Sequence, residues 1–324
     1  MGCRRTQSMD RREFLAAAAA VTVGGTLSGV AAHAGDVPAH GVSIPDAVHG
    51  RSDFVVRGRR VHQSVLAEML EQVIRGVTGA GTFSDGWRHI LRADDVVGLK
   101  FNSSGAEGLG VSEDFGDAVI TSLLAAGFEP RQIVAIEAPG EVSARHGLVS
   151  EQPGWQRVET EFGSGRDQLS DVLDRVTAIV NIPFLKDHNI TGVTCACKNL
   201  SHGLVKHPAR FHGNHCSPYI ADIIALPQIR SKVRLHLVNA LRVVFDGGPE
   251  PHDEGTWDAG VILAGRDPVA IDALGLEIIN SQRAILGLAK VDSPVRKSVY
   301  LEAAAERGLG VADTRRLGIA KIRV

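Results

Sequence analysis

One short segment of the chain, residues 186–216, concentrates the side chains that most often ligate transition metals. Five of the 13 histidines in the sequence and three of its four cysteines lie there. Imidazole and thiolate groups are donors that suit iron, zinc, nickel and copper. The sequence therefore predicts a bound transition metal, drawn from these four, and the candidate ligands are Cys195, Cys197, His202, His207, His212, His215 and Cys216.

The spacing of these candidate ligands matches no established metal signature. Cys195 and Cys197 would point to one side only from an extended chain, and the run from His212 to Cys216 resembles no zinc finger. The sequence has no C-x-x-C-x-x-C run, which argues against a ferredoxin-type cluster held by this chain alone. Two alternatives stay open. One is a disulfide between Cys216 and Cys195 or Cys197, and the other is a loop of solvated histidines without a metal.

A second group of polar residues in the same region points to an anionic ligand. Lys186 and His188 lie two residues apart just past a predicted strand, so both face one side if the strand persists. Together with Lys198 they suit a carboxylate, a phosphate or an enolate. If the protein is an enzyme, which the sequence leaves open, Lys186 would be the electrophile and His188 the base. The other candidate ligand-binding residues are Lys100, Thr191, Gly192, Asn199 and Asp246.

Alternating strands and helices are expected to position these groups. Apolar runs predict strands at residues 96–101, 133–136, 178–182, 235–245 and 260–264, and apolar periodicity predicts helices at 61–74, 114–126, 169–176 and 268–279. Such a pattern indicates an α/β fold, with a mostly parallel or mixed sheet, helices on both faces and a single main domain. Ligands of these sheets gather beyond the carboxyl ends of the strands, where Lys100, Lys186 and Asp246 fall.

The N-terminal region has the composition of an export signal. Arg11 and Arg12 precede Phe14, a weakly apolar run from Ala16 to Ala32 follows, and Ala32-His-Ala34 resembles a cleavage site. We expect residues 1–34 to be a twin-arginine signal peptide, which makes the twin-arginine translocase a partner and the location periplasmic or extracellular. A retained membrane anchor is the alternative. Residues 35–60 are interpreted as a linker or extended arm, and residues 61–324 as the α/β domain.

Composition and charge narrow the range of function classes. The chain of 324 residues is 44% hydrophobic and 22% charged, which excludes a disordered, collagen-like or coiled-coil protein. Its formal charge is -2 and its main body has no lysine or arginine block, so no nucleic-acid partner is expected. The sequence contains no G-x-S-x-G, phosphate-loop or H-E-x-x-H motif, which argues against the common chemistries that depend on them.

Four ordered motifs resemble those of the family known as domain of unknown function 362. They are N-I-P-F-L-K-D-H at 181–188, T-G-V-T at 191–194, K-N at 198–199 and G-R-D-P-V-A-I-D-A at 265–273, within a resemblance spanning about residues 100–279. Some members carry an added ferredoxin-like domain, so the resemblance implies a redox or iron-sulfur association. This chain has no such domain. The resemblance places the shared site at Lys186, His188, Lys198, Asn199, Asp267 and Asp272 rather than at the cysteines.

These observations favour an exported protein that binds a metal or cofactor and has a redox role. Two other functions stay open, namely a non-catalytic protein that binds a metal or small anion, and a metal-assisted hydrolase or isomerase acting on a carboxylate or phosphate. Asp267, which precedes Pro268, is expected to cap a helix. For Asp272, the alternative to a role in the shared site is a structural one, as the buried partner of a lysine.

Overall fold

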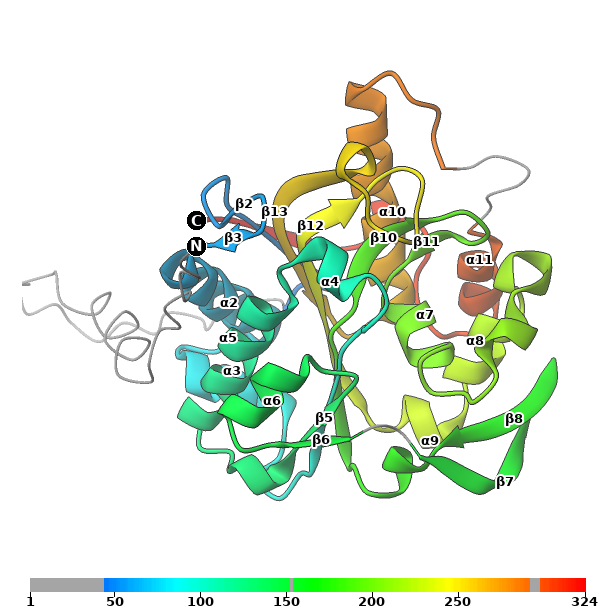
Figure 1. Ribbon diagram of the computed structural model, residues 1–324, viewed down its shortest axis with the longest axis horizontal. Helices are drawn as coiled ribbons and strands as arrows, with labels where there is room; N and C mark the ends of the chain where they lie inside the picture. The colour runs from blue at the N-terminus through cyan, green and yellow to red at the C-terminus, as the bar shows by residue number, and fades with distance from the viewer. Residues whose placement is uncertain (1–43, 152–153, 292–297) are drawn as a thin grey trace, which may run out of the picture.

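The computed structural model describes residues 44–151, 154–291 and 298–324. Its centre is a ten-stranded sheet with helices on both faces (Figure 1), which confirms the predicted α/β fold with one main domain. The strand order is β14-β1-β13-β12-β9-β4-β5-β6, with β10 paired to β12 and β11 paired to β10. A second, two-stranded sheet joins β2 to β3, and a third joins β7 to β8.

The strands are β1 (Ala47–Arg51), β2 (Val56–Arg57), β3 (Arg60–Val61), β4 (Val97–Lys100), β5 (Ile133–Ile136), β6 (Val149–Glu151), β7 (Trp155–Phe162), β8 (Gly165–Ser170), β9 (Ala178–Asn181), β10 (Phe184–His188), β11 (Gly192–Thr194), β12 (Val233–Val244), β13 (Thr256–Gly265) and β14 (Ile319–Arg323). The α-helices are α2 (Gln63–Thr78), α3 (Phe83–Ile90), α4 (Ala106–Leu109), α5 (Ser112–Ala125), α6 (Gly140–Arg145), α7 (Ala196–Ser201), α8 (Tyr219–Ile224), α9 (Pro227–Arg230), α10 (Pro268–Ile285) and α11 (Val299–Glu306).

Parallel pairing brings the carboxyl ends of three strands to one edge of the sheet. Strand β4 lies between β5 and β9 and is parallel to both, so Lys100 aligns with Ile136 and with Asn181. Strand β12 is parallel to β9 and β10 but antiparallel to β13, so the sheet is mixed. Lys100, Asn181 and the residue after β5, Glu137, therefore share the edge at which ligands of such sheets gather.

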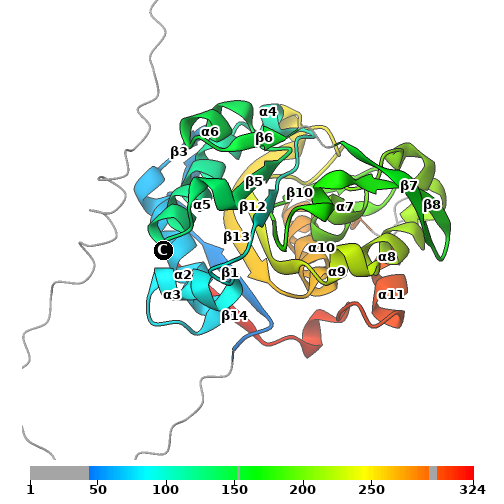
Figure 2. The same cartoon turned by 90° about the horizontal axis from the view of Figure 1, so that it is seen from below.

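Two layers of helices cover the sheet (Figure 2). Helices α2, α3, α5 and α6 lie on one side, and α7, α8, α10 and α11 lie on the other. Each layer buries its own aliphatic cluster against the sheet, for example Leu70 and Val73 of α2 on one face and Ile271 and Leu274 of α10 on the other. Burial of such side chains stabilises the fold by about 1.5 to 3 kcal/mol each.

Local signals in the sequence explain where the two main helices begin and end. Helix α2 stops at Gly79, whose left-handed φ of 69° lets its N–H bond to Arg75 O. The Asp267 side chain caps α10 by accepting hydrogen bonds from Val269 N and Ala270 N at 2.8 and 2.9 Å, which confirms the predicted cap. The helix then continues to Ile285, beyond the expected end at residue 279.

Two segments differ from the sequence prediction. Ala47–Arg51, expected in a linker or arm, form strand β1 between β13 and β14, so regular structure begins before residue 61. Gly50 allows this strand to lie under α2, because a Cβ atom there would be 2.5 Å from Val73 Cγ2. Residues 169–176, expected as a helix, instead end strand β8 and form a 3-10 turn at Asp171–Asp174.

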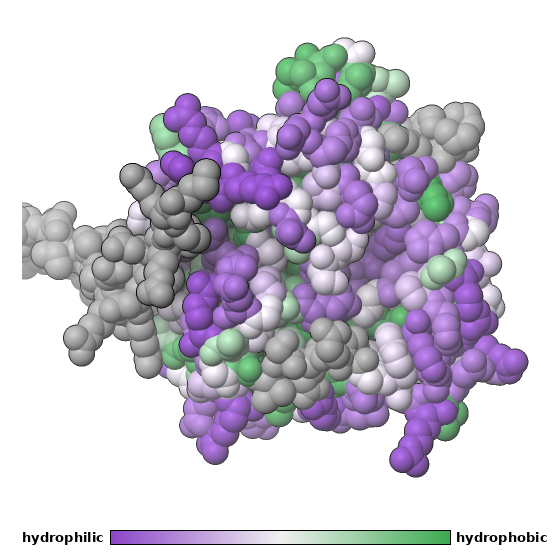
Figure 3. Space-filling view, viewed as in Figure 1, coloured by the Kyte–Doolittle hydropathy of each residue, from purple (hydrophilic) through white to green (hydrophobic). Residues whose placement is uncertain are grey.

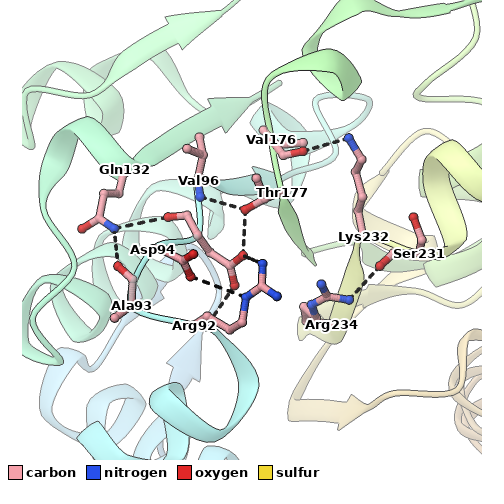
Figure 4. A network of polar contacts seen from close by, with 11 residues as sticks. Arg92, Ala93, Asp94, Val96, Gln132, Val176, Thr177, Ser231, Lys232 and Arg234 are labelled. Carbon is pink, nitrogen blue, oxygen red and sulfur yellow. Dashed lines mark hydrogen bonds and ion pairs between the residues drawn. The ribbon is translucent and has the colours of Figure 1, made fainter.

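Hydrogen bonds connect the loops at the amino-terminal edge of the parallel strands (Figure 4). Gln132 Nε2 donates to Ala93 O at 2.8 Å, and Val96 N donates to Thr177 Oγ1 at 2.9 Å. Lys232 Nζ, from the segment before β12, donates to Val176 O at 2.9 Å. These side chains pair with backbone groups of turns and strand ends, so their role at this edge is structural. A ligand site is therefore expected at the opposite edge of the sheet.

The surface seen in Figure 3 is mostly polar, with an apolar tip at the top where α10 ends. Ile285, Leu286 and Leu288 are the large apolar side chains exposed there. Over the described part of the chain, no helix combines the length and apolar character needed to cross a bilayer.

Candidate metal and anion site

Three of the predicted ligands, His202, His212 and Cys216, converge on one point. Their ligand atoms all lie within 4.8 Å of one another, so the group could hold a metal ion. His202 follows the last residue of α7. His212 lies between the 3-10 turns Pro208–Phe211 and Gly213–Cys216, and Cys216 ends the second turn. The rings of His202 and His212 meet edge to face, with centroids 4.8 Å apart.

The two histidines present nitrogen atoms suited to a metal. His212 Nδ1 lies 3.1 Å from Pro208 O and must donate to it, so the lone pair is on Nε2. His202 Nδ1 contacts Ser201 Oγ at 3.1 Å, while its Nε2 is buried and has no hydrogen-bond partner among the described residues. Burial lowers the pKa of both rings, that of His202 to well below its usual value, so both are neutral imidazoles.

Cys216 is held by an unusual turn of the backbone. Asn214, His215 and Cys216 have successive φ angles of 48°, 55° and 60°, in the left-handed region that non-glycine residues avoid. Each such residue costs on the order of 1 kcal/mol, and strain of this kind gathers at functional sites. Burial raises the pKa of the Cys216 thiol to about 11, while the nearby Lys198 acts in the opposite direction.

The other predicted metal ligands lie outside this trio. Cys195 and Cys197 are fully buried beside Asp272, and these two cysteines and Cys216 are all free thiols. His207 Nδ1 pairs with Asp167 Oδ1 at 2.9 Å, and His215 Nδ1 lies 2.9 Å from Ile190 O. These contacts with protein groups account for one ring nitrogen of each histidine.

Two lysines and a histidine lie next to the trio. Lys198 Nζ is 2.5 Å from His188 Nε2 and 3.3 Å from His212 Nε2. Lys186 Nζ donates to Ser104 O at 2.7 Å. Burial lowers the pKa of Lys186 to about 8, and the nearby Glu250 partly offsets this shift. Burial also lowers the pKa of Lys198 to about 8, while Cys216 raises it and Lys186 lowers it further. Ile190 N and Thr191 N donate to His188 Nδ1, so the ring proton is on Nε2 and Lys198 Nζ accepts it. A bound anion would favour the charged forms of the two buried lysines.

The family comparison bears on this part of the chain. Residues 151–277 match the model of the family described as "Domain of unknown function (DUF362)". The DUF362 match is shorter than the resemblance expected from the motifs, and it contains the trio and the neighbouring Lys186, His188 and Lys198. A comparison with curated proteins finds no match.

Three predicted ligand-binding residues, Thr191, Gly192 and Asp246, have close contacts with other parts of the protein. Thr191 Oγ1 donates to Val193 O at 3.0 Å, and a Cβ atom on Gly192 would lie 2.5 Å from Ser298 Oγ. Asp246 Oδ1 pairs with Arg283 Nη1 at 2.5 Å. Asp272, which the resemblance places in the shared site and for which a lysine partner is the alternative, accepts from Ala196 N at 2.6 Å and Tyr300 Oη at 2.8 Å, and neither donor is a lysine.

Lys100 and Asn199 belong to a buried chain of hydrogen bonds that spans the strand ends. Lys100 Nζ pairs with Glu137 Oε1 and donates to Asn199 Oδ1, both at 3.1 Å. Asn199 Nδ2 donates to Asn181 Oδ1 at 2.7 Å, and Asn181 Nδ2 lies 3.0 Å from His236 Nδ1. Burial lowers the pKa of Lys100, and Glu137 counteracts this. The sequence did not single out Asn181 or His236 as site residues, although Asn181 begins the first of the four motifs and ends an otherwise apolar strand.

A cavity of about 590 Å³ lies at the far end of this chain of contacts, N-terminal to the DUF362 segment. Ser103, Glu137 and Glu141 line it together with residues of α5 and α6, but no member of the trio does. Glu137 reaches it from a left-handed backbone position with φ of 53°. The two glutamates, 137 and 141, thus face one space, which the sequence did not establish.

Proposed function

We propose that this protein binds a transition-metal ion through His202, His212 and Cys216, and that Lys186, His188 and Lys198 hold an anionic ligand beside it. The observation that carries the proposal is the convergence of three ligand atoms within 4.8 Å, one of which, His202 Nε2, is buried without a partner among the described residues. A buried polar atom without a partner costs about 1 to 3 kcal/mol, and a metal ion would remove that cost.

The ligand set indicates which metals and which chemistry fit. Two imidazoles and one thiolate suit zinc or copper best among the four metals considered, and three protein ligands leave a coordination position open. A metal bound there would supply Lewis-acid or electron-transfer chemistry. The neighbouring lysines would neutralise and orient a carboxylate or phosphate group of the ligand, and His188 would be within reach of it for proton transfer.

Elemental analysis of matched variants tests the metal site. The mature protein, purified anaerobically, is expected to contain about one equivalent of metal, and a His202→Ala, His212→Ala double variant is expected to lose it. His207→Ala, whose side chain pairs with Asp167, is the matched control and should keep the metal. Retention of metal by the double variant would refute the assignment.

The kind of metal then decides between the two classes of function. A redox role, which we propose first, requires a redox-active metal such as copper or iron, visible as an absorption band or an electron paramagnetic resonance signal. Zinc would instead favour a metal-assisted hydrolase or isomerase, which the adjacent Lys186 and His188 also support. Loss of the signal in the double variant, and its retention in His207→Ala, would tie it to this site.

We further propose that the protein is exported by the twin-arginine pathway. Arg11, Arg12 and the Ala32-His-Ala34 sequence support this proposal. The expected mature protein begins at Gly35, which N-terminal mass spectrometry of the exported protein checks. An Arg11→Lys, Arg12→Lys variant should accumulate inside the cell with residues 1–34 attached, and normal export of that variant would contradict the proposal.

A further inference from the structure

A second, smaller cavity lies away from the metal trio, between α9, the start of β12 and the start of α10. It has a volume of about 200 Å³. Its polar lining consists of Arg230, His236 and Arg266, and its aliphatic lining includes Leu200, Ile229 and Leu309. Among the residues that the structure describes, no acidic residue lines it.

One of the polar residues that line this cavity, His236, is itself buried. His236 is only 1% exposed, and its Nδ1 lies 3.0 Å from Asn181 Nδ2. The orientation of the Asn181 amide is fixed, because Nδ2 also donates to Ala196 O and Oδ1 accepts from Asn199 Nδ2. His236 Nδ1 must therefore be the acceptor, so the ring proton is on Nε2. Burial lowers the pKa of His236 to about 3, which keeps the ring neutral in this tautomer.

His236 Nε2–H has no partner among the described residues, since the contact with Asn181 is the ring's single hydrogen bond there. Because His236 lines the cavity and Nδ1 is engaged, this N–H is the polar group that the ring offers to the cavity. A hydrogen-bond donor that faces a cavity and has no partner among the described residues can donate to a ligand or a water molecule.

Two arginines, Arg230 and Arg266, complete the polar lining, and both are exposed residues at the rim of the molecule's surface. Arg230 Nη2 donates to Gly308 O at 3.1 Å and has no ion pair within the described ranges 44–151, 154–291 and 298–324. Over the same ranges, Arg266 makes neither a hydrogen bond nor an ion pair. Arginines without carboxylate partners among the described residues, beside an N–H donor that faces the cavity, suit an oxyanion.

We propose that this cavity is a second ligand site, separate from the metal site, which binds a small aliphatic carboxylate. The carboxylate would lie between the two arginines and His236, and a short hydrocarbon chain would contact Leu200, Ile229 and Leu309. The volume equals that of about seven liquid water molecules, so the ligand has about that many non-hydrogen atoms. The proposal goes beyond the proposed function and does not depend on the metal.

Titration of the mature protein with butyrate, followed by NMR, tests this site. Butyrate is expected to bind saturably and to shift the His236 Nε2–H resonance. The neutral isostere butyramide should bind at least about fivefold more weakly, since it lacks the charge that the arginines recognise. Arg266→Gln should raise the dissociation constant for butyrate about fivefold. Arg234→Gln is the matched control, because Arg234 contacts Ser231 O and does not line the cavity.

Two results would overturn the assignment. Equal binding of butyrate and butyramide, or an unchanged dissociation constant in Arg266→Gln, would show that the cavity does not select a carboxylate. Tighter binding of inorganic phosphate than of butyrate would show that it takes a bare oxyanion without a hydrocarbon chain. The His202→Ala, His212→Ala variant should bind butyrate normally, so failure of this proposal and failure of the metal proposal are distinguishable.

Discussion

At the scale of single residues, the candidate metal ligands differ in what else they contact. His202, His207 and His215 each have a protein partner for one ring nitrogen, but only the second nitrogen of His202 is buried without a partner among the described residues. The sequence could predict the region, because the density of histidine and cysteine is visible in it. It could not select the trio, since the selection depends on a left-handed turn at residues 214–216 and on the distant Asp167.

The state of the three cysteines gives a prediction at this scale. Cys195, Cys197 and Cys216 are free and all 0% exposed, so thiol reagents should react slowly with the native mature protein. After denaturation without reductant, we expect three reactive thiols per chain. A Cys216 disulfide with Cys195 or Cys197 would leave one. The count in denaturant therefore separates the free-thiol structure from the disulfide alternative.

At the scale of elements, the sequence predicted those whose signals are local. The apolar run of β4 and the cap of α10 are examples. Strand β1 was missed because glycines and prolines in residues 35–60 are typical of a linker, while Gly50 in fact serves the close approach of α2. The segment at 169–176 was misassigned because its first residues are held extended by distant partners that its own sequence does not show: Leu169 bridges Val205, and Ser170 pairs with Trp155 of β7.

The cap of α10 yields a stability prediction. Asp267 accepts hydrogen bonds from Val269 N and Ala270 N, and its other oxygen accepts from Val311 N at 2.8 Å. Asp267→Ala should lower the free energy of unfolding by about 2 kcal/mol, at the upper end for a helix cap, because the contact to Val311 is lost as well. Thr82→Ala, which removes the exposed cap of α3, is the comparison and should cost about 1 kcal/mol. Urea unfolding of both variants measures the difference, and equal costs would show that the contact to Val311 adds nothing.

At the scale of the whole molecule, buried polar groups join parts of the chain that are far apart in sequence. The chain from Glu137 through Lys100, Asn199 and Asn181 to His236 runs between the cavity of about 590 Å³ and the cavity of about 200 Å³. Such a network specifies one arrangement of the strands, because each group is costly to bury if its partner is missing. Asp272 plays a similar part, since it ties α10 to the start of α7 and to Tyr300 of α11.

Asp272 therefore makes the stability of the whole molecule depend on pH. Burial raises its pKa to about 6, although hydrogen bonds from Tyr300 and Cys197 act in the opposite direction. The folded state thus binds this proton more tightly than the unfolded state. The resulting stabilisation is complete below pH 4 and is lost as pH rises through about 6, at a rate of up to about 1.4 kcal/mol per pH unit.

Comparison with Asp272→Asn isolates this contribution, because the variant does not titrate at that position. The free energy of unfolding of the wild type minus that of the variant should fall between pH 4 and 6 and level off above it, as measured by urea unfolding. Tyr300→Phe removes a hydrogen bond that favours the charged carboxylate, so in that background the decline should extend to higher pH. A difference that stays constant or rises with pH would mean that Asp272 is charged in the folded protein throughout this range, and that the buried carboxylate is stabilised by its backbone donors.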